Sequence, residues 1–194
     1  MVEDRLGNAA AVGSCLEADL RRGIMLIRKE EPGDYEIVYS VVKNAFDSAE
    51  HSDGKEQDLV NALRKGDAFI PELSLVAEID GKLVGHIMFT RAKVGENTVL
   101  VLAPLSVLPE YQRKGAGISL IREGHKIADK LGYGYSIVLG SPKYYPKTGY
   151  LPADRFGVRP PFDVPNENFM VCKIKEDAPD ICGTVKYAKE FGID

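Results

Sequence analysis

The sequence contains only three cysteines, has no long apolar run and lacks any excess of basic residues. The cysteines are Cys15, Cys172 and Cys182. Their odd number and wide spacing argue against a disulfide framework or a zinc knuckle and indicate a reducing compartment. The apolar runs are far too short to span a bilayer, and the acidic start at Glu3 and Asp4 is unlike a signal peptide. We therefore predict a cytoplasmic protein without a membrane partner or a bound metal.

Positive charge is also scarce relative to negative charge. The chain has 25 Lys and Arg against 29 Asp and Glu, which gives a formal net charge of -4. Sequence-independent binding to nucleic acid needs a basic excess that displaces counterions, so we expect no nucleic-acid partner. The remaining composition, 44% hydrophobic and 28% charged, is typical of a soluble globular protein, and 194 residues suit one domain.

The first 23 residues mix glycine, alanine and charged residues without a clear strand pattern. We predict that residues 1–23 form an N-terminal appendage, either disordered or folded as a short helix over Ala9 to Leu20. Residues 24–194 are predicted to form a single domain. The segment Leu151 to Pro165 contains four prolines, so it is expected to be mostly loop or sheet edge.

Apolar periodicity predicts two helices and then a run of strands. Asp80-Gly81 is a two-residue hairpin signal, so the strands around it and the next strand should form an antiparallel meander. An amphipathic helix and a wholly apolar strand follow, in an order typical of a right-handed crossover. The expected helices are Asp34–Phe46, Glu56–Lys65 and Ile118–Leu131, and the expected strands are Met25–Arg28, Leu73–Ile79, Lys82–Val94, Thr98–Val107, Tyr135–Leu139, Asn168–Ile174 and Thr184–Tyr187.

The segment Gln112-Arg113-Lys114-Gly115-Ala116-Gly117 lies between an expected strand and an expected helix. Two glycines one residue apart let the backbone approach a ligand closely. The helix that follows presents unpaired N–H groups and a partial positive charge at its start. This combination predicts a phosphate or pyrophosphate site, and a tight strand-to-helix turn is the simpler alternative.

Both common nucleotide motifs fail by residue type. A P-loop needs a glycine at its first position and a Lys-Ser/Thr pair at its end, where this chain has Ile118-Ser119. The Rossmann fingerprint needs a third glycine, and Leu120 occupies that position. The phosphate site therefore belongs to another class.

Two segments resemble the motifs of the GNAT superfamily of N-acetyltransferases. The segment Gln112 to Gly117, after Leu105-Ser106-Val107 and Pro109-Glu110-Tyr111, resembles the family's acetyl-CoA signature Q/R-x-x-G-x-G/A. The segment Tyr145 to Tyr150 resembles its Tyr-x-x-x-Gly-Phe/Tyr element. The order of elements agrees over about residues 25 to 175. The paired Tyr144-Tyr145, the proline-rich stretch and Phe162 to Pro165 are most similar to the YhbS-like subgroup, and Ile118 departs from the small or polar residue of several relatives.

The resemblance implies an α/β fold with one mixed, mostly antiparallel sheet of six or seven strands flanked by helices. The sheet would splay open after Val107 and admit acetyl-CoA as cosubstrate. Main-chain groups of Leu105, Ser106 and Val107 would pair with pantetheine and polarise the thioester carbonyl. Tyr145 would protonate the leaving thiolate as a general acid. The backbone N–H groups that would hold the CoA pyrophosphate are those of Gln112, Arg113, Lys114, Gly115, Ala116, Gly117 and Ile118.

The acceptor amine must lose a proton before it attacks, because a free alkyl ammonium has a pKa near ~10.4. A base is therefore required, and the sequence does not identify it. No cysteine is placed to suggest an acetyl-enzyme, so direct attack in a ternary complex is expected. The candidate bases by residue type are Glu56, Glu72, Glu78 and His86, of which His86, between apolar neighbours, is more simply a satisfied structural histidine.

Several other polar residues are predicted to be structural or solvated. These are Tyr144, the surface histidines His51 and His125, and the solvated pair Glu30-Glu31; Cys172 is expected to act as a small hydrophobe within a strand.

The acceptor, a small molecule or a protein, is expected beside residues 47–67 and 151–165. A strand near the C-terminus could also pair across a homodimer.

Three alternatives to an amine acetyltransferase stay open at this point. The first is a CoA-binding sensor without significant catalysis, the second is transfer to oxygen or of a longer acyl group, and the third is a phosphate-binding protein unrelated to CoA.

Overall fold

The computed structural model describes residues 24–47 and 53–193. The predicted appendage, residues 1–23, therefore lies outside the described residues, as does His51. In the described residues the α-helices are α2 (Tyr35–Phe46), α3 (Glu56–Leu63) and α4 (Ala116–Lys130), and the strands are β1 (Met25–Lys29), β2 (Phe69–Ile79), β3 (Lys82–Val94), β4 (Asn97–Val107), β5 (Tyr135–Leu139), β6 (Leu151–Pro152), β7 (Val158–Arg159), β8 (Phe169–Lys173) and β9 (Gly183–Lys186).

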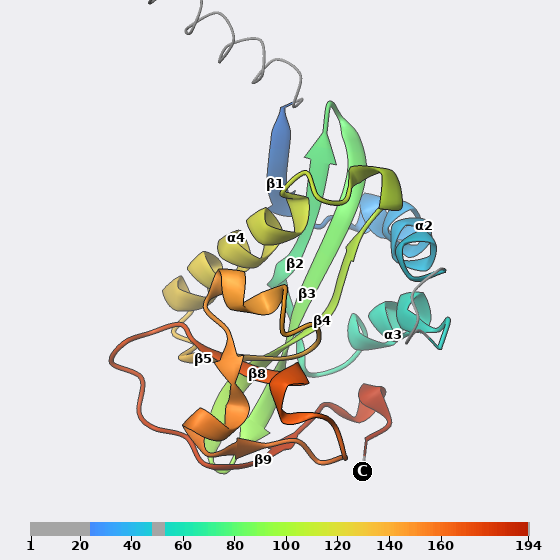
Figure 1. The fold of residues 1–194 in the computed structure, drawn as a ribbon. Helices are drawn as coiled ribbons and strands as arrows, with labels where there is room; N and C mark the ends of the chain where they lie inside the picture. Colours follow the sequence, from blue (N-terminus) through green and yellow to red (C-terminus); the bar gives the residue numbers. More distant parts are fainter. Residues whose placement is uncertain (1–23, 48–52, 194) are drawn as a thin grey trace, which may run out of the picture.

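The strands follow the order β1-β2-β3-β4-β5-β8-β6, and β9 pairs with β3 and β7 (Figure 1). The pairs along that order are antiparallel except β4 with β5, which is the parallel pair expected from a crossover through α4. The predicted fold class, a mostly antiparallel sheet flanked by helices, is confirmed. The described residues form nine strands where six or seven were expected, because the proline-rich stretch contains the two-residue strands β6 and β7.

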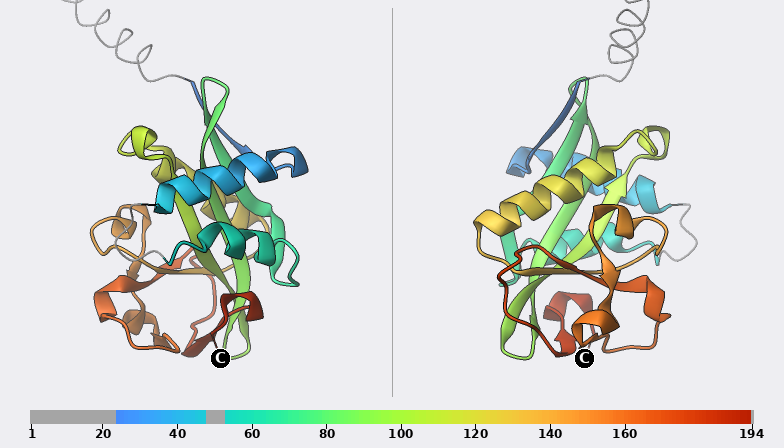
Figure 2. Two further views of the ribbon diagram at one scale, coloured as in Figure 1. Left: turned by 90° about the vertical axis from the view of Figure 1, so that its right-hand side faces the viewer. Right: turned by 60° about the vertical axis from the view of Figure 1, so that its left-hand side comes forward.

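The helices cover both faces of the sheet. Figure 2 shows α2 and α3 over one face and α4 over the other. Helix α2 buries Val38, Val41 and Val42 against the sheet, and this packing offsets the weak helix propensity of β-branched residues. On the opposite face, α4 crosses β3 where Gly124 meets the ring of Phe89. A side chain at Gly124 would clash with that ring, so glycine there allows close packing of helix on sheet.

Most expected boundaries lie close to the observed ones, and strand β2 is the largest exception. It begins at Phe69, although its expected start was Leu73. Pro71 and an irregular register between Phe69 and Ser74 interrupt the alternation that the sequence pattern relies on. No helix among the described residues is long and apolar enough to cross a membrane.

The sheet splays open between β4 and β5. These strands pair only at Leu100 with Ser136 and at Val101 with Ile137. The opening therefore starts after Val101, and the prediction that it starts after Val107 was wrong. The cause is a register shift opposite β3, where Ile87 pairs with Leu105 and Phe89 pairs with Leu102. The extra residue makes a bulge in β4, and bulges bend a strand locally.

Candidate functional site

The final residues of β4 present main-chain groups to the gap between β4 and β5. The Leu108 N–H donates to the Val84 oxygen at 2.9 Å, and Ser106 faces His86 two positions earlier in the register. Hydrogen-bonded pairs alternate along an antiparallel ladder, so Ser106 also bonds to β3, while Leu105 and Val107 direct their N–H and C=O groups into the gap. The Gln112 Nε2 donates to the Val107 oxygen at 3.2 Å, which agrees with this orientation.

The turn before α4 contains two residues in the left-handed backbone conformation. Arg113 and Gly115 have positive φ values of 60° and 94°. Such left-handed residues curl successive N–H groups toward one point and form an anion-binding concavity. A Cβ on Gly115 would meet nothing within 4 Å, so the backbone conformation selects glycine there and the space beside it is open. Arg113, which is not glycine, stores backbone strain in this conformation.

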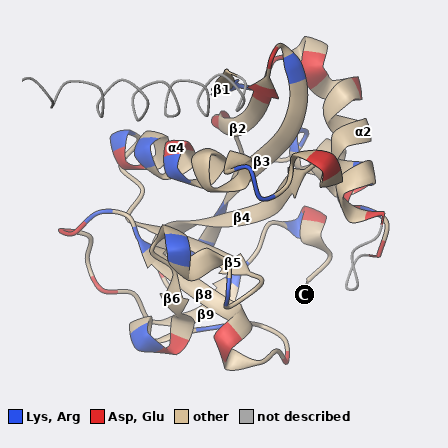
Figure 3. Cartoon of the chain, turned by 45° about the horizontal axis from the view of Figure 1, so that its top comes forward, with Lys and Arg blue, Asp and Glu red and all other residues tan. Residues whose placement is uncertain are grey.

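Helix α4 begins without a side-chain cap. Gly115 is its N-cap residue, and the Ser119 N–H is the one that returns to the Gly115 oxygen, at 3.0 Å. The N–H groups of the first turn, from Ala116 to Ile118, therefore project from the helix end with its partial positive charge. Figure 3 shows Lys and Arg at this turn and along α4, and Lys114 lies over the ring of Tyr111 at 4.9 Å.

The start of α4 approaches both sides of the gap. A Cβ on Gly117 would clash with the Tyr144 hydroxyl and would lie 3.6 Å from Leu105 Cδ2. Gly117 thus lies beside β4 and beside the segment that follows β5. Tyr144, which the sequence indicated to be structural, reaches this point with its hydroxyl. The only sequence feature that pointed to a place for Tyr144 near the site was its position next to Tyr145.

Tyr145 begins the short 3₁₀ helix Tyr145–Thr148, which follows β5, and its ring lies against Gly140. Its ring stacks edge-on with Tyr144 at 5.2 Å and with Tyr150 at 5.6 Å between centroids. Among the described residues its hydroxyl has no hydrogen-bond partner. Burial, with a smaller contribution from Tyr144, raises the pKa of Tyr145 above its ordinary value. Tyr145 is thus a rigidly packed phenol that stays protonated at neutral pH.

A buried polar network supports Tyr150 behind Tyr145. The Tyr150 hydroxyl is 2.7 Å from Ser136 Oγ and 3.1 Å from His125 Nε2. His125 is half-buried, so the prediction of a surface histidine was wrong, and burial lowers its pKa to about 4. Cys172 is buried in β8, as expected, and burial raises its pKa to about 11.

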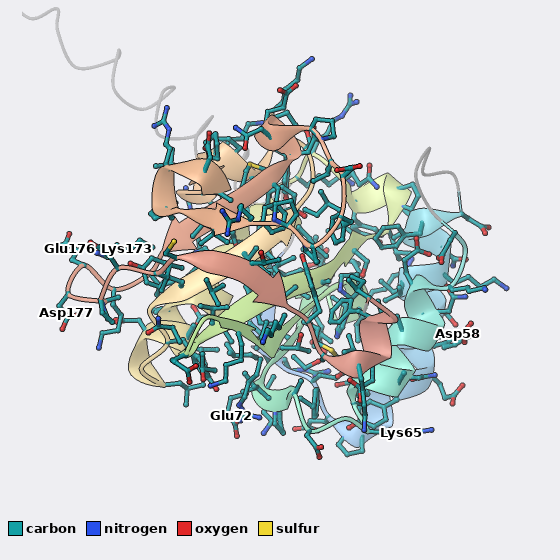
Figure 4. All side chains as sticks on the ribbon, turned by 90° about the horizontal axis from the view of Figure 1, so that it is seen from below. Asp58, Lys65, Glu72, Lys173, Glu176 and Asp177 are labelled. Atoms are coloured by element: carbon teal, nitrogen blue, oxygen red, sulfur yellow. The ribbon has the colours of Figure 1, made fainter. Side chains whose placement is uncertain are left out.

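The three glutamates that were candidate bases lie in three different parts of the structure. Glu72 extends from the rim of the molecule and faces Lys29 at 3.8 Å (Figure 4). Glu78 accepts hydrogen bonds from Arg28 near the edge strand β1. Glu56 begins α3, and its buried Oε2 has no partner within the described part of the chain.

His86 and Glu30 differ from their predicted roles. The His86 side chain is completely buried, and its Nδ1 has no hydrogen-bond partner in the described chain, so it is not a satisfied histidine. Glu30, expected to be solvated, is 5% exposed and pairs with Arg64. Its partner Ser74 is 44 positions away, a separation that no local pattern reveals.

The family model for the acetyltransferase (GNAT) family matches residues 36–150. YjhQ of Escherichia coli K12, an uncharacterized N-acetyltransferase, is 42% identical over 119 residues, which are 59% of this chain and 66% of YjhQ. YhbS of the same strain, another uncharacterized N-acetyltransferase, is 32% identical over 171 residues, which are 86% of this chain and 98% of YhbS.

Solved structures give the same match in three dimensions. The 1.55 Å crystal structure of E. coli YhbS in complex with CoA has a TM-score of 0.78 at 28% identity and covers 87% of this chain and 92% of that one. The crystal structure of a GNAT family acetyltransferase from Brucella melitensis in complex with acetyl-CoA has a TM-score of 0.73 at 34% identity. It covers 87% of this chain and 98% of its own.

Proposed function

Because the chain belongs to the acetyltransferase (GNAT) family, we propose that it transfers an acetyl group from acetyl-CoA to a primary amine by direct attack within a ternary complex. The observation that supports this most strongly is the gap between β4 and β5 with the uncapped start of α4 beside it. The two solved relatives hold CoA and acetyl-CoA, which supports acetyl-CoA as the cosubstrate.

In this proposal the turn and the first turn of α4 bind the CoA pyrophosphate. The donors are the backbone N–H groups from Gln112 to Ile118, including those of Arg113, Lys114, Gly115, Ala116 and Gly117. The left-handed conformations of Arg113 and Gly115 support this role, because they aim neighbouring N–H groups at one anion. The side chains of Arg113 and Lys114 add charge near the site.

The pantetheine arm then runs along the exposed side of β4 as an added strand. Its partners are the main-chain groups of Leu105 and Val107, because the backbone of Ser106 already bonds to β3. A β4 N–H group in the gap polarises the thioester carbonyl as negative charge develops on its oxygen. The parallel β4–β5 contact ends at Val101, so the gap reaches deep enough for the thioester to lie inside the sheet layer.

Tyr145 acts as the general acid. A thiolate with a reference pKa near ~8.5 leaves more easily when a phenol donates a proton as the C–S bond breaks. The raised pKa of the partly buried Tyr145 keeps its phenol protonated and supports that role. Cys172 does not support a covalent acetyl-enzyme, because burial raises the pKa of its thiol to about 11 and disfavours the nucleophilic thiolate.

The remaining expectations stay predictions. They are a cytoplasmic location, action without a metal, a homodimer, and an acceptor site formed by residues 47–67 and 151–165.

Transfer to amines can be tested by thiol release from acetyl-CoA in the presence of a panel of primary amines. We suggest n-propylamine, putrescine, glycinamide and a tripeptide with an internal lysine, with ethanol as an oxygen acceptor. Thiol release that depends on an amine, with the acetylated amine identified by mass spectrometry, is the expected result. Binding of acetyl-CoA without acetylation of any panel amine would favour a CoA-binding sensor and contradict the proposal.

A further inference from the structure

A buried polar cluster lies on the α2/α3 face of the sheet, and one of its residues, His86, pairs with Ser106 near the end of β4. It consists of Glu30 after β1, Arg64 after α3, Ser74 on β2 and His86 on β3. The side chains of Glu30, Arg64 and His86 are at most 5% exposed. Phe89 contacts α4 on the opposite face, so the strand alternation places His86 on the α2/α3 face, as its contact with Glu30 requires.

The hydrogen bonds of this cluster determine the tautomer of His86. Ser74 Oγ donates its one proton to Glu30 Oε2 at 2.6 Å, because a carboxylate can only accept. Ser74 Oγ also lies 3.1 Å from His86 Nε2, and there it can only accept. Nε2 therefore carries the proton, and Nδ1 carries a basic lone pair. Glu30 thus supports the ring through Ser74, in the way that a carboxylate orients a catalytic histidine.

The lone pair on Nδ1 is fully buried and has no partner in the described chain. An unsatisfied buried acceptor is costly and is one of the features that mark functional groups. Ser106 lies directly opposite His86 in the β3–β4 register, so both side chains project from the same face. The Ser106 hydroxyl donates to the His86 main-chain oxygen at 3.3 Å, and the neighbouring main-chain groups of Leu105 and Val107 face the gap.

We propose that His86 Nδ1 accepts, through the Ser106 hydroxyl, the proton that the acceptor amine loses during acetyl transfer. The ammonium N–H proton passes to Ser106 Oγ while the Ser106 proton passes to Nδ1, so the serine is regenerated and the amine becomes neutral. The amine nitrogen then bonds to the acetyl carbon, the C–S bond breaks, and the thiolate takes its proton from Tyr145. Tyr145 regains a proton when the new amide nitrogen loses its second one. The proton on His86 returns to solvent after release of the products. This inference rests on the proposed function.

The charges around His86 suit a base that works at neutral pH. Burial lowers the pKa of His86, the hydrogen bond and charge of Glu30 raise it, and Arg64 lowers it further, with a net result below the ordinary value. Burial alone would raise the pKa of Glu30, but bonds from His86, Arg64 and Ser74 lower it to about 2. His86 is therefore neutral at pH 7 and faces a carboxylate that stabilises the protonated ring.

The test is the pH dependence of acetyl transfer to the best amine of the panel in the wild type and in His86→Gln. Glutamine keeps an N–H donor for Ser74 and removes the basic nitrogen. In the wild type we expect a nearly flat second-order rate between pH 7 and 9. In His86→Gln we expect a loss of about 1,000-fold at pH 7. Because the amine must then lose its proton unaided, the variant rate should rise about tenfold per pH unit and approach the wild type near pH 10.

Thr90→Val is the matched control. Thr90 lies on the same strand and face, is fully buried, and has an unpartnered Oγ1 in the described chain. It should leave the rate and its pH profile unchanged. If His86→Gln fails to fold, as judged by acetyl-CoA binding, Ser106→Ala should give the same steep profile with the ring in place.

An unchanged rate at pH 7 in His86→Gln, or an equal loss at every pH, would overturn the assignment of His86. Absence of transfer to every panel amine in the wild type would instead reject the proposed function, and the assignment of His86 with it. The two failures are therefore separable by the wild-type measurement alone.

Discussion

In this acetyltransferase, burial sets the pKa of Tyr145, and the backbone conformation at position 115 requires glycine. Tyr145 has an ordinary phenol whose pKa rises because it is packed between two other tyrosine rings. Gly115 has no close neighbours and is selected by its positive φ. The first case predicts an effect on turnover and the second an effect on cosubstrate binding.

Tyr145→Phe should lower kcat by about 100-fold and leave acetyl-CoA affinity unchanged, because the ring packing is kept and only the acid is removed. In the wild type this acid is protonated below its raised pKa, so it should cause no fall in rate below pH 10. Steady-state kinetics between pH 6 and pH 10 would check both points. Tyr133→Phe is the control, because the Tyr133 hydroxyl bonds to Arg91 at 3.0 Å, outside the site. Equal kcat in both variants would reject Tyr145 as the acid.

Gly115→Ala should weaken acetyl-CoA binding by at least tenfold. The substitution forces alanine into a left-handed conformation at a cost of about 1–2 kcal/mol and places a methyl group where the pyrophosphate is proposed to lie. Gly132→Ala is a matched control at the other end of α4, since Gly132 also has a positive φ, of 87°, and open space around its Cα. Urea denaturation should give similar losses for the two variants, and calorimetry should show weaker binding for Gly115→Ala alone. Equal affinities would contradict the site.

At the scale of elements, the placement of α4 decides whether its first turn meets the gap. The helix rests on β3 through Gly124, where no side chain fits beside Phe89. The other side of the gap depends on the bulge in β4, after which β4 no longer pairs with β5. Apolar periodicity predicts neither the contact of Gly124 with Phe89 nor the bulge in β4, because each depends on a partner strand that is distant in sequence.

Gly124→Ala should destabilise the protein by about 1–3 kcal/mol through overpacking against Phe89, which outweighs the gain of up to ~1 kcal/mol from helix propensity. Glu123→Ala, at the neighbouring position, removes a surface pair with Lys126 and should change stability by less than about 0.5 kcal/mol. Urea denaturation midpoints would compare them. A stabilised Gly124→Ala would show that α4 does not pack closely here.

At the scale of the whole molecule, buried neutral histidines make stability depend on pH. The pKa of His125 falls to about 4 on folding from a value near ~6.5 in the unfolded chain, and burial also lowers the pKa of His86. Protons then bind more strongly to the unfolded state below pH 6.5. Stability should be complete above that pH and should fall toward pH 4. For His125 alone the loss at pH 5 should be about 2 kcal/mol.

Urea denaturation at pH 7 and pH 5 measures this loss, and His125→Gln, which retains a polar partner for Tyr150, should show a smaller one. An equal loss in the variant and the wild type would assign the pH dependence to other groups.

The sequence predicted the architecture well, since the meander and the crossover through α4 depend on local patterns. The buried cluster was missed because Glu30 looks solvated beside Glu31, and its partners come from β2, β3 and the end of α3. The depth of the gap was missed because it depends on the register between β3 and β4. Local chemistry is readable from residue types, whereas pairings between distant strands are set by tertiary packing.

Isothermal titration with acetyl-CoA, with ATP and NAD as controls, tests the central claim most directly. We predict saturable binding of acetyl-CoA, weak or absent binding of the controls, and loss of binding in Gly115→Glu and Gly117→Glu while both variants remain folded by circular dichroism. A wild-type protein that fails to bind millimolar acetyl-CoA, or folded variants that bind it as well as the wild type, would contradict the account.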